Sequence, residues 1–510
     1  MITKIISGAI SGIDGYKVTV EVDIVQGIPS FDIVGLPDAS IKESRERVKS
    51  ALNNTGYQFP IRKIIINLAP SNIRKEGSYF DLPIAVGLLV HLKKIEASKV
   101  ANTFFAGELS LDGYLRPISG VLSMVHNCFL AGVTTFFVPK ENAKEAALIE
   151  GAKIVGVSHI DEVVNYLNGD IALDNADDEA EDTASHVENL LDFVDVRGQE
   201  SAIRALMIAA AGAHNLLMIG PPGSGKTMMA KRLPSILPDL TTGESITTTK
   251  VYSVSGQLKD KNALIQKRPF RSPHHTISYA ALVGGGRNIK PGEISLAHNG
   301  ILFLDELPEF SRSVLEVMRQ PLEDKEVNLS RATNSVTYPA NFMLVASMNP
   351  CPCGNYTLGD KCTCTQGEIA RYLGKISGPL LDRIDIHIEV SGLAFKDIQP
   401  GHQKGQDSSA HLKEQVMRVK AIQKQRYGND TQNAHLSASE IETYCQVDAE
   451  GAALLQTAFD HFGLSARAYH KILKVARTIA DLAGEVDISP MHLAEAINYR
   501  SLDRKYFSMN

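Results

Sequence analysis

The sequence has no apolar run of about eighteen residues or more, which excludes an ordinary membrane-spanning helix. Its first residues, MITKIISGAISGIDGYKV, lack the basic start, apolar core and cleavage site of a secretory signal. Cysteine is scarce too, because six residues in 510 are too few for a disulfide-stabilised scaffold of this size. These absences predict a soluble, cytoplasmic protein with no membrane partner.

Basic residues are missing between Lys153 and Arg197, where twelve acidic residues occur, densest in DNADDEAEDTASHVE. The formal net charge of −6 therefore hides an uneven distribution. Without these twelve acids, 46 acidic residues face 52 basic ones, so the remainder carries +6. That balance is compatible with a polyanion such as DNA but does not establish one, because binding depends on how charges cluster. The acidic run itself is typical of a solvated linker.

Hydrophobic periodicity predicts an α/β multidomain protein. Residues 1–172 mix strand-like runs such as KVTVEVDI with helix-like runs such as DLPIAVGLLVHLKK, which indicates an α/β domain. Residues 173–192 form the acidic linker. Over 193–395, short apolar strands (NLLMIG, GILFLDE, NFMLVASMN) alternate with helices, the pattern of a parallel sheet. Residues 396–510 begin with a polar, glycine-containing break and are then predicted to be helical.

The segment GPPGSGKT matches the eight-residue phosphate-binding loop; it follows an apolar strand and opens a helix, as such a loop requires. Glycines let backbone N–H groups wrap the phosphates, and the helix start adds a positive dipole. Lys226 is expected to reach the β and γ phosphates of ATP, and Thr227 to bind Mg²⁺. The predicted nucleotide-binding residues are Gly220, Pro221, Pro222, Gly223, Ser224, Gly225, Lys226 and Thr227.

Two further apolar strands end in polar residues suited to ATP hydrolysis. GILFLDE ends in Asp305, predicted to hold Mg²⁺ through water, and in Glu306, predicted to orient the attacking water. FMLVASMN ends in Asn349, where a polar side chain could touch the γ phosphate or the water. Alone, each has an ordinary alternative, an exposed strand end or a turn residue. Paired with the phosphate loop, Asp305 and Glu306 indicate a hydrolysis site, whereas the role of Asn349 stays open.

The order of the phosphate loop, LFLDE, Asn349, LLDRID and LSARAYHKILKVARTIADL resembles the AAA+ ATPases. RPFRSPHHTIS, LPEFSRSVLEVMRQPLED and NPCPCG extend this, over essentially the whole chain, to a resemblance to the magnesium-chelatase-like YifB/ComM family. The resemblance implies an AAA+ phosphate-loop sheet with a helical C-terminal lid. It also implies a homo-hexameric, ATP- and Mg²⁺-dependent helicase for branch migration of single-stranded or branched DNA in recombination during natural transformation, with a recombinase as a candidate partner.

Two arginines take roles from this resemblance. Arg383 in LLDRID matches the arginine finger that reaches a neighbouring subunit's γ phosphate, and Arg467 in SARAYHK matches the sensor-2 arginine of the lid. A permanently charged guanidinium can offset charge developing on the transferred phosphoryl group. Without the family context, a surface ion pair is the ordinary alternative for each. A finger supplied by a neighbour implies that the active unit is a ring.

Two N-terminal segments, RKEGSYFDLPIAVGLL and FAGELSLDGYLRPISGVLSM, resemble the proteolytic domain of Lon. The chemistry of Lon needs a Ser nucleophile beside a Lys base. The resemblance puts Tyr79 at the serine position and Leu122 at the lysine position, so the dyad is absent. Ser78 is adjacent but has no evident base. A Lon-like domain without proteolysis is therefore predicted, serving as a binding or assembly module.

Four of the six cysteines crowd into NPCPCGNYTLGDKCTCT as Cys351, Cys353, Cys362 and Cys364. Four thiolates this close predict a structural Zn²⁺ site directly after Asn349, with no ligand position left for catalysis. The C-x-C spacing departs from the usual C-x₂-C, and free or redox-active thiols are the alternative.

Two segments are candidates for contact with DNA phosphates. KRPFRSPHHTISYAALVGGGRNIKPGE is basic and glycine-rich, with a solvated insertion as its alternative. DKEVNLSRATNSVTYPANF alternates around a turn, where related ring helicases carry a pore hairpin, with a simple connecting hairpin as its alternative. Adjacent His274 and His275 are not expected to share a metal ion, because neighbours cannot easily face one ion. The candidate DNA-contacting residues are Arg268, Arg271, Arg287, Lys290, Lys325 and Arg331.

A magnesium-chelatase-type motor is the alternative function, since the nucleotide domain also resembles the ATPase subunit of that enzyme. Such a motor would remodel a protein or a porphyrin-bearing partner. An ATP-dependent protease would need the missing dyad, and a non-motor scaffold would use ATP only to assemble. The prediction of DNA as substrate depends on the resemblance and on the +6 balance outside the linker.

Overall fold

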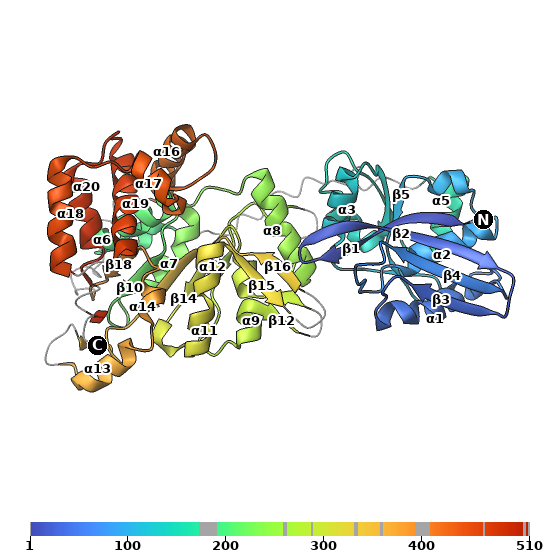
Figure 1. The fold of residues 1–510 in the computed structure, drawn as a ribbon, viewed down its shortest axis with the longest axis horizontal. Coiled ribbons are helices and arrows are strands. Elements are labelled where there is room, and N and C mark those ends of the chain that lie inside the picture. Colours follow the sequence, from blue (N-terminus) through green and yellow to red (C-terminus); the bar gives the residue numbers. More distant parts are fainter. Residues whose placement is uncertain are drawn as a thin grey trace. The chain divides into compact units, whose positions relative to one another are not determined.

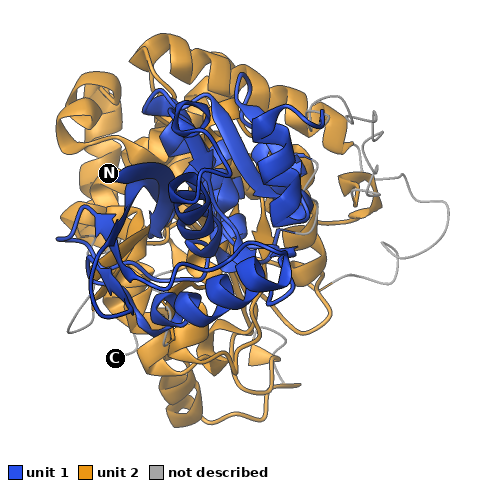
Figure 2. Ribbon diagram, turned by 90° about the vertical axis from the view of Figure 1, so that its right-hand side faces the viewer, with its two compact units in different colours: residues 1–186, 245–265 blue, residues 187–244, 266–510 orange. Residues whose placement is uncertain are grey.

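The computed structural model describes residues 2–172, 191–258, 263–286, 289–330, 335–356, 361–392, 408–462, 465–502 and 506–507. The chain divides into two compact units, which are coloured separately in Figure 2; Figure 1 labels the helices and strands. The first unit is Met1–His186 with Ser245–Ile265, and the second is Val187–Glu244 with Gln266–Asn510. Most of the predicted linker lies outside the described residues. Among those described, no helix is long and apolar enough to cross a membrane.

The first unit contains a mixed seven-stranded sheet in the order β3-β4-β2-β1-β5-β8-β9. β2 pairs antiparallel with both β1 and β4, and the other neighbours are parallel. Alternation along β2 buries Val18, Val20 and Val22 completely. The strands are β1 (Thr3–Ser11), β2 (Asp14–Val25), β3 (Ser30–Val34), β4 (Lys63–Ala69), β5 (Thr103–Phe105), β8 (Thr135–Pro139) and β9 (Lys153–Val157), with a separate ribbon of β6 (Glu108–Leu109) and β7 (Leu115–Arg116).

Helices of the first unit share one hydrophobic core with this sheet. They are α1 (Ala39–Asn54), α2 (Asp81–His91), α3 (Val121–Leu130), α4 (Lys140–Ala146) and α5 (Ile160–Asn168). Most of α8 (Thr242–Ser255) also belongs here. Its Lys250 Nζ lies 3.2 Å from Asp14 Oδ1, and its Ser253 hydroxyl donates to Glu145. A segment predicted within the nucleotide domain is thus packed in the N-terminal unit; the domain boundaries themselves stay predictions.

The second unit is built on a five-stranded, all-parallel sheet in the order β11-β14-β17-β10-β18. Its three central strands are buried on both faces, which explains their continuous apolar sequences. Alternate residues point to two different cores; Met218 and Phe303 lie in one, Leu217 and Leu302 in the other. The strands are β10 (Leu216–Ile219), β11 (Phe270–Arg271), β14 (Ile301–Leu304), β17 (Met343–Met348) and β18 (Ile386–Glu389).

Around this sheet lie α6 (Glu200–Gly212), α7 (Lys226–Arg232), α9 (Tyr279–Val283), α10 (Glu293–Leu296), α11 (Arg312–Val317), α12 (Arg319–Asp324), α13 (Gln366–Leu373) and α14 (Gly378–Leu381). Two ribbons accompany them, β12 (Gly284–Gly285) with β13 (Lys290–Pro291) and β15 (Glu326–Ser330) with β16 (Ser335–Pro339). The second ribbon is the hairpin expected from DKEVNLSRATNSVTYPANF; its connecting residues 331–334 lie outside the described part.

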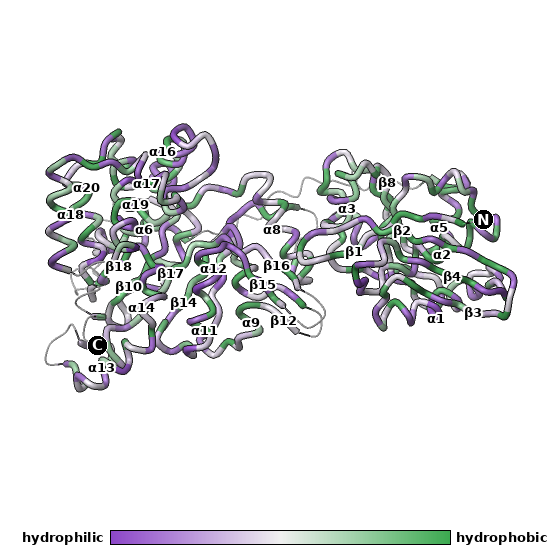
Figure 3. The backbone as a smooth tube through the Cα atoms, viewed as in Figure 1, coloured by the Kyte–Doolittle hydropathy of each residue, from purple (hydrophilic) through white to green (hydrophobic). Residues whose placement is uncertain are grey.

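The C-terminal region is helical, as predicted, and comprises α16 (Ser409–Tyr427), α17 (Ala438–Tyr444), α18 (Ala449–Phe462), α19 (Ala466–Ala483) and α20 (Pro490–Asn498). Hydrophobic and hydrophilic residues recur in turn along α18 and α20 (Figure 3). Ser437 and Ser465 cap α17 and α19, and left-handed Gly484 ends α19. The α/β multidomain fold, with a parallel phosphate-loop sheet and a helical C-terminal lid, is therefore confirmed.

Candidate functional site

The phosphate loop joins the end of β10 to the start of α7. Gly223 and Gly225 adopt left-handed φ values of +76° and +89°, which other residues rarely tolerate. A Cβ at Gly220 would lie 2.3 Å from the carbonyl oxygen of Val390, so only glycine fits beside the strand. A Cβ at Gly223 would meet nothing within 4 Å, which leaves open space over the loop. The loop geometry therefore suits a bound phosphate.

Lys226 is buried, with 8% of its surface exposed, and its ammonium group lies inside the loop. Nζ donates to the carbonyl oxygens of Gly220 at 2.8 Å and Pro221 at 2.9 Å. It also reaches Asn349 Oδ1 at 3.3 Å, which brings the strand-end asparagine to the phosphate loop. Burial lowers the pKa of Lys226, and the carboxylates of Asp305 and Glu306 oppose that shift.

Thr227 and Asp305, the two predicted Mg²⁺ ligands, are in direct contact. The Thr227 hydroxyl donates to Asp305 Oδ2 at 2.7 Å. The other carboxylate oxygen of Asp305 accepts from the hydroxyl of Ser347, a fully buried residue of β17. Hydroxyl and carboxylate oxygens at one point are a donor set suited to Mg²⁺, so the residues fit this ion. Sequence reasoning missed Ser347; a polar residue inside an otherwise apolar strand was its signal.

Glu306 has an unusual backbone for a residue with a side chain, at φ +54° and ψ +50°. Such a left-handed conformation costs of order 1–3 kcal/mol and persists where surrounding contacts impose it. Its N–H donates to Asp305 Oδ1 at 3.0 Å. Its carboxylate is 57% exposed and lies 3.5 Å from His275 Nδ1. His275 was not among the predicted hydrolysis residues; its place after β11, the neighbour of β14, could have indicated it.

Arg383 and Arg467 lie together, but at the opposite edge of the sheet from the phosphate loop. Arg383 precedes β18, which runs parallel to β10, whereas the phosphate loop follows β10. A four-residue strand separates these edges by about 10 Å. Glu323 binds both guanidinium groups, at 2.6 Å for Arg383 and 3.6 Å for Arg467.

The two arginines line a cavity of about 600 Å³ in which cations outnumber anions. Lys325, predicted to contact DNA, lines the same cavity, and burial lowers its pKa. Asp385 at the cavity wall lies 2.7 Å from Lys471 Nζ. Burial alone would raise the pKa of Asp385, but Lys471 and His214 outweigh it and hold this pKa well below its usual range. The cationic residues lining the cavity are Lys325, Arg383, Arg467, Lys471 and Lys474.

The remaining DNA candidates differ in accessibility. Arg268 is buried in a bidentate ion pair with Glu244, at 2.9 Å, and also donates to backbone carbonyls, which gives it a structural role. Arg271 is half-buried and pairs with Glu293 at 2.6 Å. Lys290 is exposed on β13. Arg287 and Arg331 lie outside the described residues.

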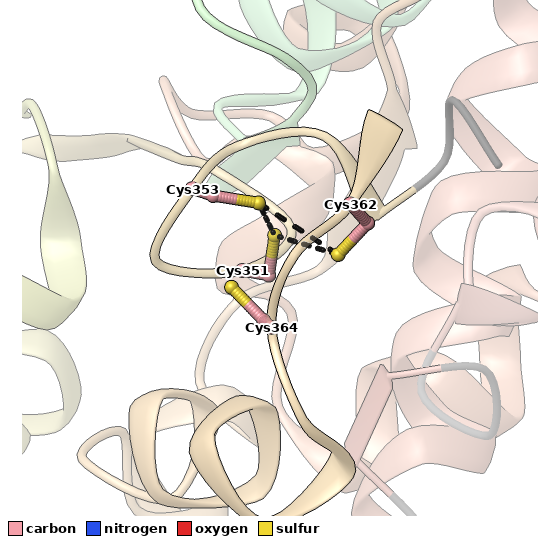
Figure 4. Close-up of side chains that lie close together, drawn as sticks. All are labelled: Cys351, Cys353, Cys362 and Cys364. Atoms are coloured by element: carbon pink, nitrogen blue, oxygen red, sulfur yellow. Dashed lines mark hydrogen bonds between the residues drawn. The ribbon is translucent and has the colours of Figure 1, made fainter. Parts of the chain in front are cut away.

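The four clustered cysteines come together as predicted. Their Sγ atoms all lie within 4.8 Å of one another (Figure 4). Cys351 Sγ is 3.3 Å from Cys353 Sγ and 3.8 Å from Cys362 Sγ. A tetrahedral zinc with Zn–S bonds of about 2.3 Å needs sulfur separations of about 3.8 Å, so the set fits zinc. Backbone N–H groups of Asn355 and Thr363 lower the pKa of Cys353 to about 6, which favours its thiolate.

The positions of the Lon dyad hold apolar or bulky residues in the first unit. Leu122 is fully buried in α3, and Tyr79 is buried with 9% exposed. The Ser78 hydroxyl donates to Glu108, a carboxylate that is itself 3.6 Å from Arg116. Ser78 thus lies beside an acid and not beside a lysine base at the position of Leu122.

Comparison with known proteins matches three segments to magnesium-chelatase families. Residues 192–398 match "Magnesium chelatase, subunit ChlI", residues 20–142 "Subunit ChlI of Mg-chelatase", and residues 406–500 the "subunit ChlI C-terminal" family. The chain is 46% identical to "Competence protein ComM" of Haemophilus influenzae, over 98% of this chain and 97% of that one. It is 43% identical to the protein YifB of Escherichia coli, over 97% and 96%. It is also 31% identical to Lon protease 2 of Bacillus subtilis, over 28% and 26%.

Replacing Ser347 tests the contact that holds Asp305. In Ser347→Ala, Asp305 loses its buried donor, and we expect the Mg²⁺ concentration for half-maximal ATP hydrolysis to rise roughly 10-fold or more, as for other groups that orient metal ligands. A magnesium titration at saturating ATP measures this. Ser295→Ala is the matched control, because Ser295 is also fully buried but its hydroxyl has no hydrogen-bond partner among the described residues. An unchanged magnesium requirement in Ser347→Ala would contradict the assignment.

Proposed function

The chain belongs to the magnesium-chelatase-like YifB/ComM family of AAA+ proteins, and from this we propose that it is an ATP-hydrolysing motor that acts on DNA by branch migration or strand unwinding. The observation that carries the ATPase part is the meeting of Lys226, Thr227, Asp305 and Asn349 at one edge of the sheet. The DNA part is supported by the relative named for competence and by the basic balance outside the linker.

Each residue at this edge has a role that its chemistry suits. Lys226 binds the β and γ phosphates by exchanging loop carbonyls for phosphate oxygens, and Thr227 and Asp305 hold Mg²⁺. Mg²⁺, when bound, neutralises charge on the phosphate oxygens. Glu306 orients and deprotonates the attacking water, and Asn349 contacts the γ phosphate. Loop carbonyls are neutral partners, so a phosphate competes with them on favourable terms for a buried ammonium group.

Arg383 and Arg467 support assembly into a ring. Both lie at the edge opposite the phosphate loop of their own subunit, so they are placed to serve a neighbour. Contacts between two different faces of one chain are head-to-tail, and they form a ring when the rotation between neighbouring subunits closes. We propose a homo-hexamer in which each Arg383 completes the next site as arginine finger and Arg467 assists from the lid. Glu323 would release both arginines on assembly.

DNA is proposed to pass through this ring and to be held by its phosphates. Arg331 belongs, in the sequence, to the segment that connects β15 to β16, and Lys290 on β13 is exposed. Arg271 and Lys325 are weaker candidates, since Arg271 is paired with Glu293 and Lys325 is half-buried. Arg287 is a candidate from its place in the basic segment of the sequence. Single-stranded or branched DNA in recombination during transformation is the proposed substrate, with a recombinase as partner.

The chelatase families that match all three segments favour a second candidate, a motor that remodels a protein or porphyrin-bearing partner. The two candidates share the hydrolysis site and differ in what stimulates it.

ATP hydrolysis by the purified chain, with and without single-stranded and branched DNA, tests the proposal. We expect DNA to raise turnover, more at low than at physiological salt, because phosphate contacts release counterions. Lys226→Ala should lower turnover roughly 100-fold or more. If no DNA changes turnover and none binds even at low salt, the DNA motor is wrong, and protein and porphyrin partners become the substrates to test.

Mixing two inactive variants tests whether Arg383 acts on a neighbour. Lys226→Ala and Arg383→Ala should each be inactive alone. In mixed rings, a Lys226 from one variant can meet an Arg383 from the other, and random assembly creates such a pair at about a quarter of the interfaces. We therefore expect up to about a quarter of the wild-type rate from an equal mixture. A mixture as inactive as its parts would show that Arg383 acts within its own subunit or not at all.

We further propose that the cysteine cluster binds a structural Zn²⁺. The protein purified without chelator should contain about one zinc per chain, measured by elemental analysis, because the four thiolates fill all ligand positions. Cys351→Ser and Cys364→Ser should each lose the metal. Cys445→Ser is the control, since Cys445 is buried in the helical C-terminal region and belongs to a different hydrophobic core from Cys351. Metal-free protein that takes up no added zinc would favour free thiols instead.

A further inference from the structure

His275 and Glu306 lie at the same edge of the sheet, each the same number of residues after a pair of residues that face each other in neighbouring strands. β11 pairs with β14 in parallel register, with Arg271 opposite Leu302. His275 lies four residues after Arg271, and Glu306 lies four residues after Leu302. Both segments therefore leave the sheet at the edge where the phosphate loop lies. The imidazole Nδ1 then comes within 3.5 Å of Glu306 Oε2.

The His275 ring is fixed by its neighbours. Its centroid lies 4.1 Å from that of His274, and its edge faces Phe310 at 6.4 Å with an interplanar angle of 79°. Phe310 is buried, with 2% of its surface exposed, so its ring is held by the core and restricts the position of the His275 ring. His274 differs, because its Nδ1 is 2.9 Å from the hydroxyl of Thr276. The two Nδ1 atoms therefore have separate partners, Glu306 for His275 and Thr276 for His274.

Glu306 needs an external group to set its direction. Its backbone is held in the left-handed region, but its carboxylate is more than half exposed. In the part of the chain that the structure describes, His275 is the cationic or imidazole side chain that lies within ion-pair distance of this carboxylate. A carboxylate that orients a water molecule uses one of its oxygens for that water. A hydrogen-bond donor to the other oxygen then fixes the direction in which the first oxygen points. Such contacts are often long in a free enzyme and shorten around the substrate.

We propose that His275 is a positioning residue for ATP hydrolysis, whose Nδ1 holds one carboxylate oxygen of Glu306 and so directs the other to the attacking water. This inference depends on the proposed role of Glu306. It makes the segment 272–278, between β11 and α9, part of the hydrolysis site.

Four substitutions in the full chain separate the polar role of His275 from a packing role. We expect His275→Ala to lower kcat for ATP roughly 10- to 100-fold, the loss typical of a misdirected catalytic group, with KM changed less than about twofold. His275→Asn keeps a donor close to the position of Nδ1 and should restore most of kcat. His275→Phe keeps a ring against Phe310 without the donor and should be as slow as His275→Ala. His274→Ala removes one neighbour of the His275 ring but keeps the Nδ1 contact with Glu306, so it should lower kcat much less than His275→Ala.

The opposite pattern would overturn the inference. If His275→Phe is fast and His275→Asn is slow, the ring of His275 contributes packing and does not position Glu306. If His275→Ala keeps the wild-type kcat, Glu306 needs no holder. The comparison of His275→Asn with His275→Phe remains decisive even when His275→Ala unfolds. Glu306→Gln is measured in parallel: full activity in it would refute the proposed role of Glu306 itself, whereas its inactivity beside a fully active His275→Ala refutes only the role of His275.

Discussion

Parallel pairing of the strands in the second unit decides which side chains can meet. Parallel neighbours send all their carboxyl ends to one edge, so β10, β14 and β17 deliver the phosphate loop, Asp305 and Asn349 to the same place. The strands are buried on both faces, and a shift by one residue would move every side chain into the opposite core. Core packing therefore determines the register of the strands, and this register places Lys226 and Thr227 in contact with their partners.

The buried charged groups at the two edges of the parallel sheet have different kinds of partner. At the carboxyl edge, the bonds of the Lys226 ammonium go to neutral oxygens, and its pKa is lowered by burial. That cation keeps most of its attraction for an added anion, which is what a phosphate site needs. At the amino edge, Asp385 is neutralised by Lys471 of α19. Losing one partner of such a buried pair costs about 3–5 kcal/mol, so the pair fastens the lid helix to the start of β18.

The sequence predicted residues whose chemistry is local in the chain. The phosphate loop, the acid pair after β14 and the C-x-C pairs are each short motifs with an apolar strand or a turn beside them, and the described structure brings each set together. The alternation of strands and helices also predicted the parallel sheet and the helical lid. What could not be predicted depends on strand order. His275 meets Glu306 only because β11 lies beside β14, and Ser347 meets Asp305 only because β17 lies on the other side.

The basic composition of a segment does not show whether its arginines are free to contact DNA. Arg268 belongs to a basic, glycine-rich segment, which suggested a DNA contact, yet its guanidinium closes a buried ion pair with Glu244. Charge counts cannot tell a solvent-facing arginine from one that ties two segments together, because the partner acid lies 24 residues away in the chain. The packing of α8 in the first unit could not be predicted for the same reason. Its polar contacts, such as that of Lys250 with Asp14, join residues that lie far apart in the sequence.

The two arginines and the phosphate loop lie at opposite edges of the sheet of one subunit. A guanidinium before β18 cannot reach past the sheet to the loop after β10, whatever its rotamer, because the strand between them is longer than the arginine side chain. Within one subunit, Arg383 and Arg467 can only pair with a local acid, and Glu323 is that acid. In an assembly through opposite edges, the same charges would face a neighbour's phosphates. In the proposed ring, hydrolysis would depend on a neighbouring subunit because of strand direction, and no conformational change would be required in the sheet.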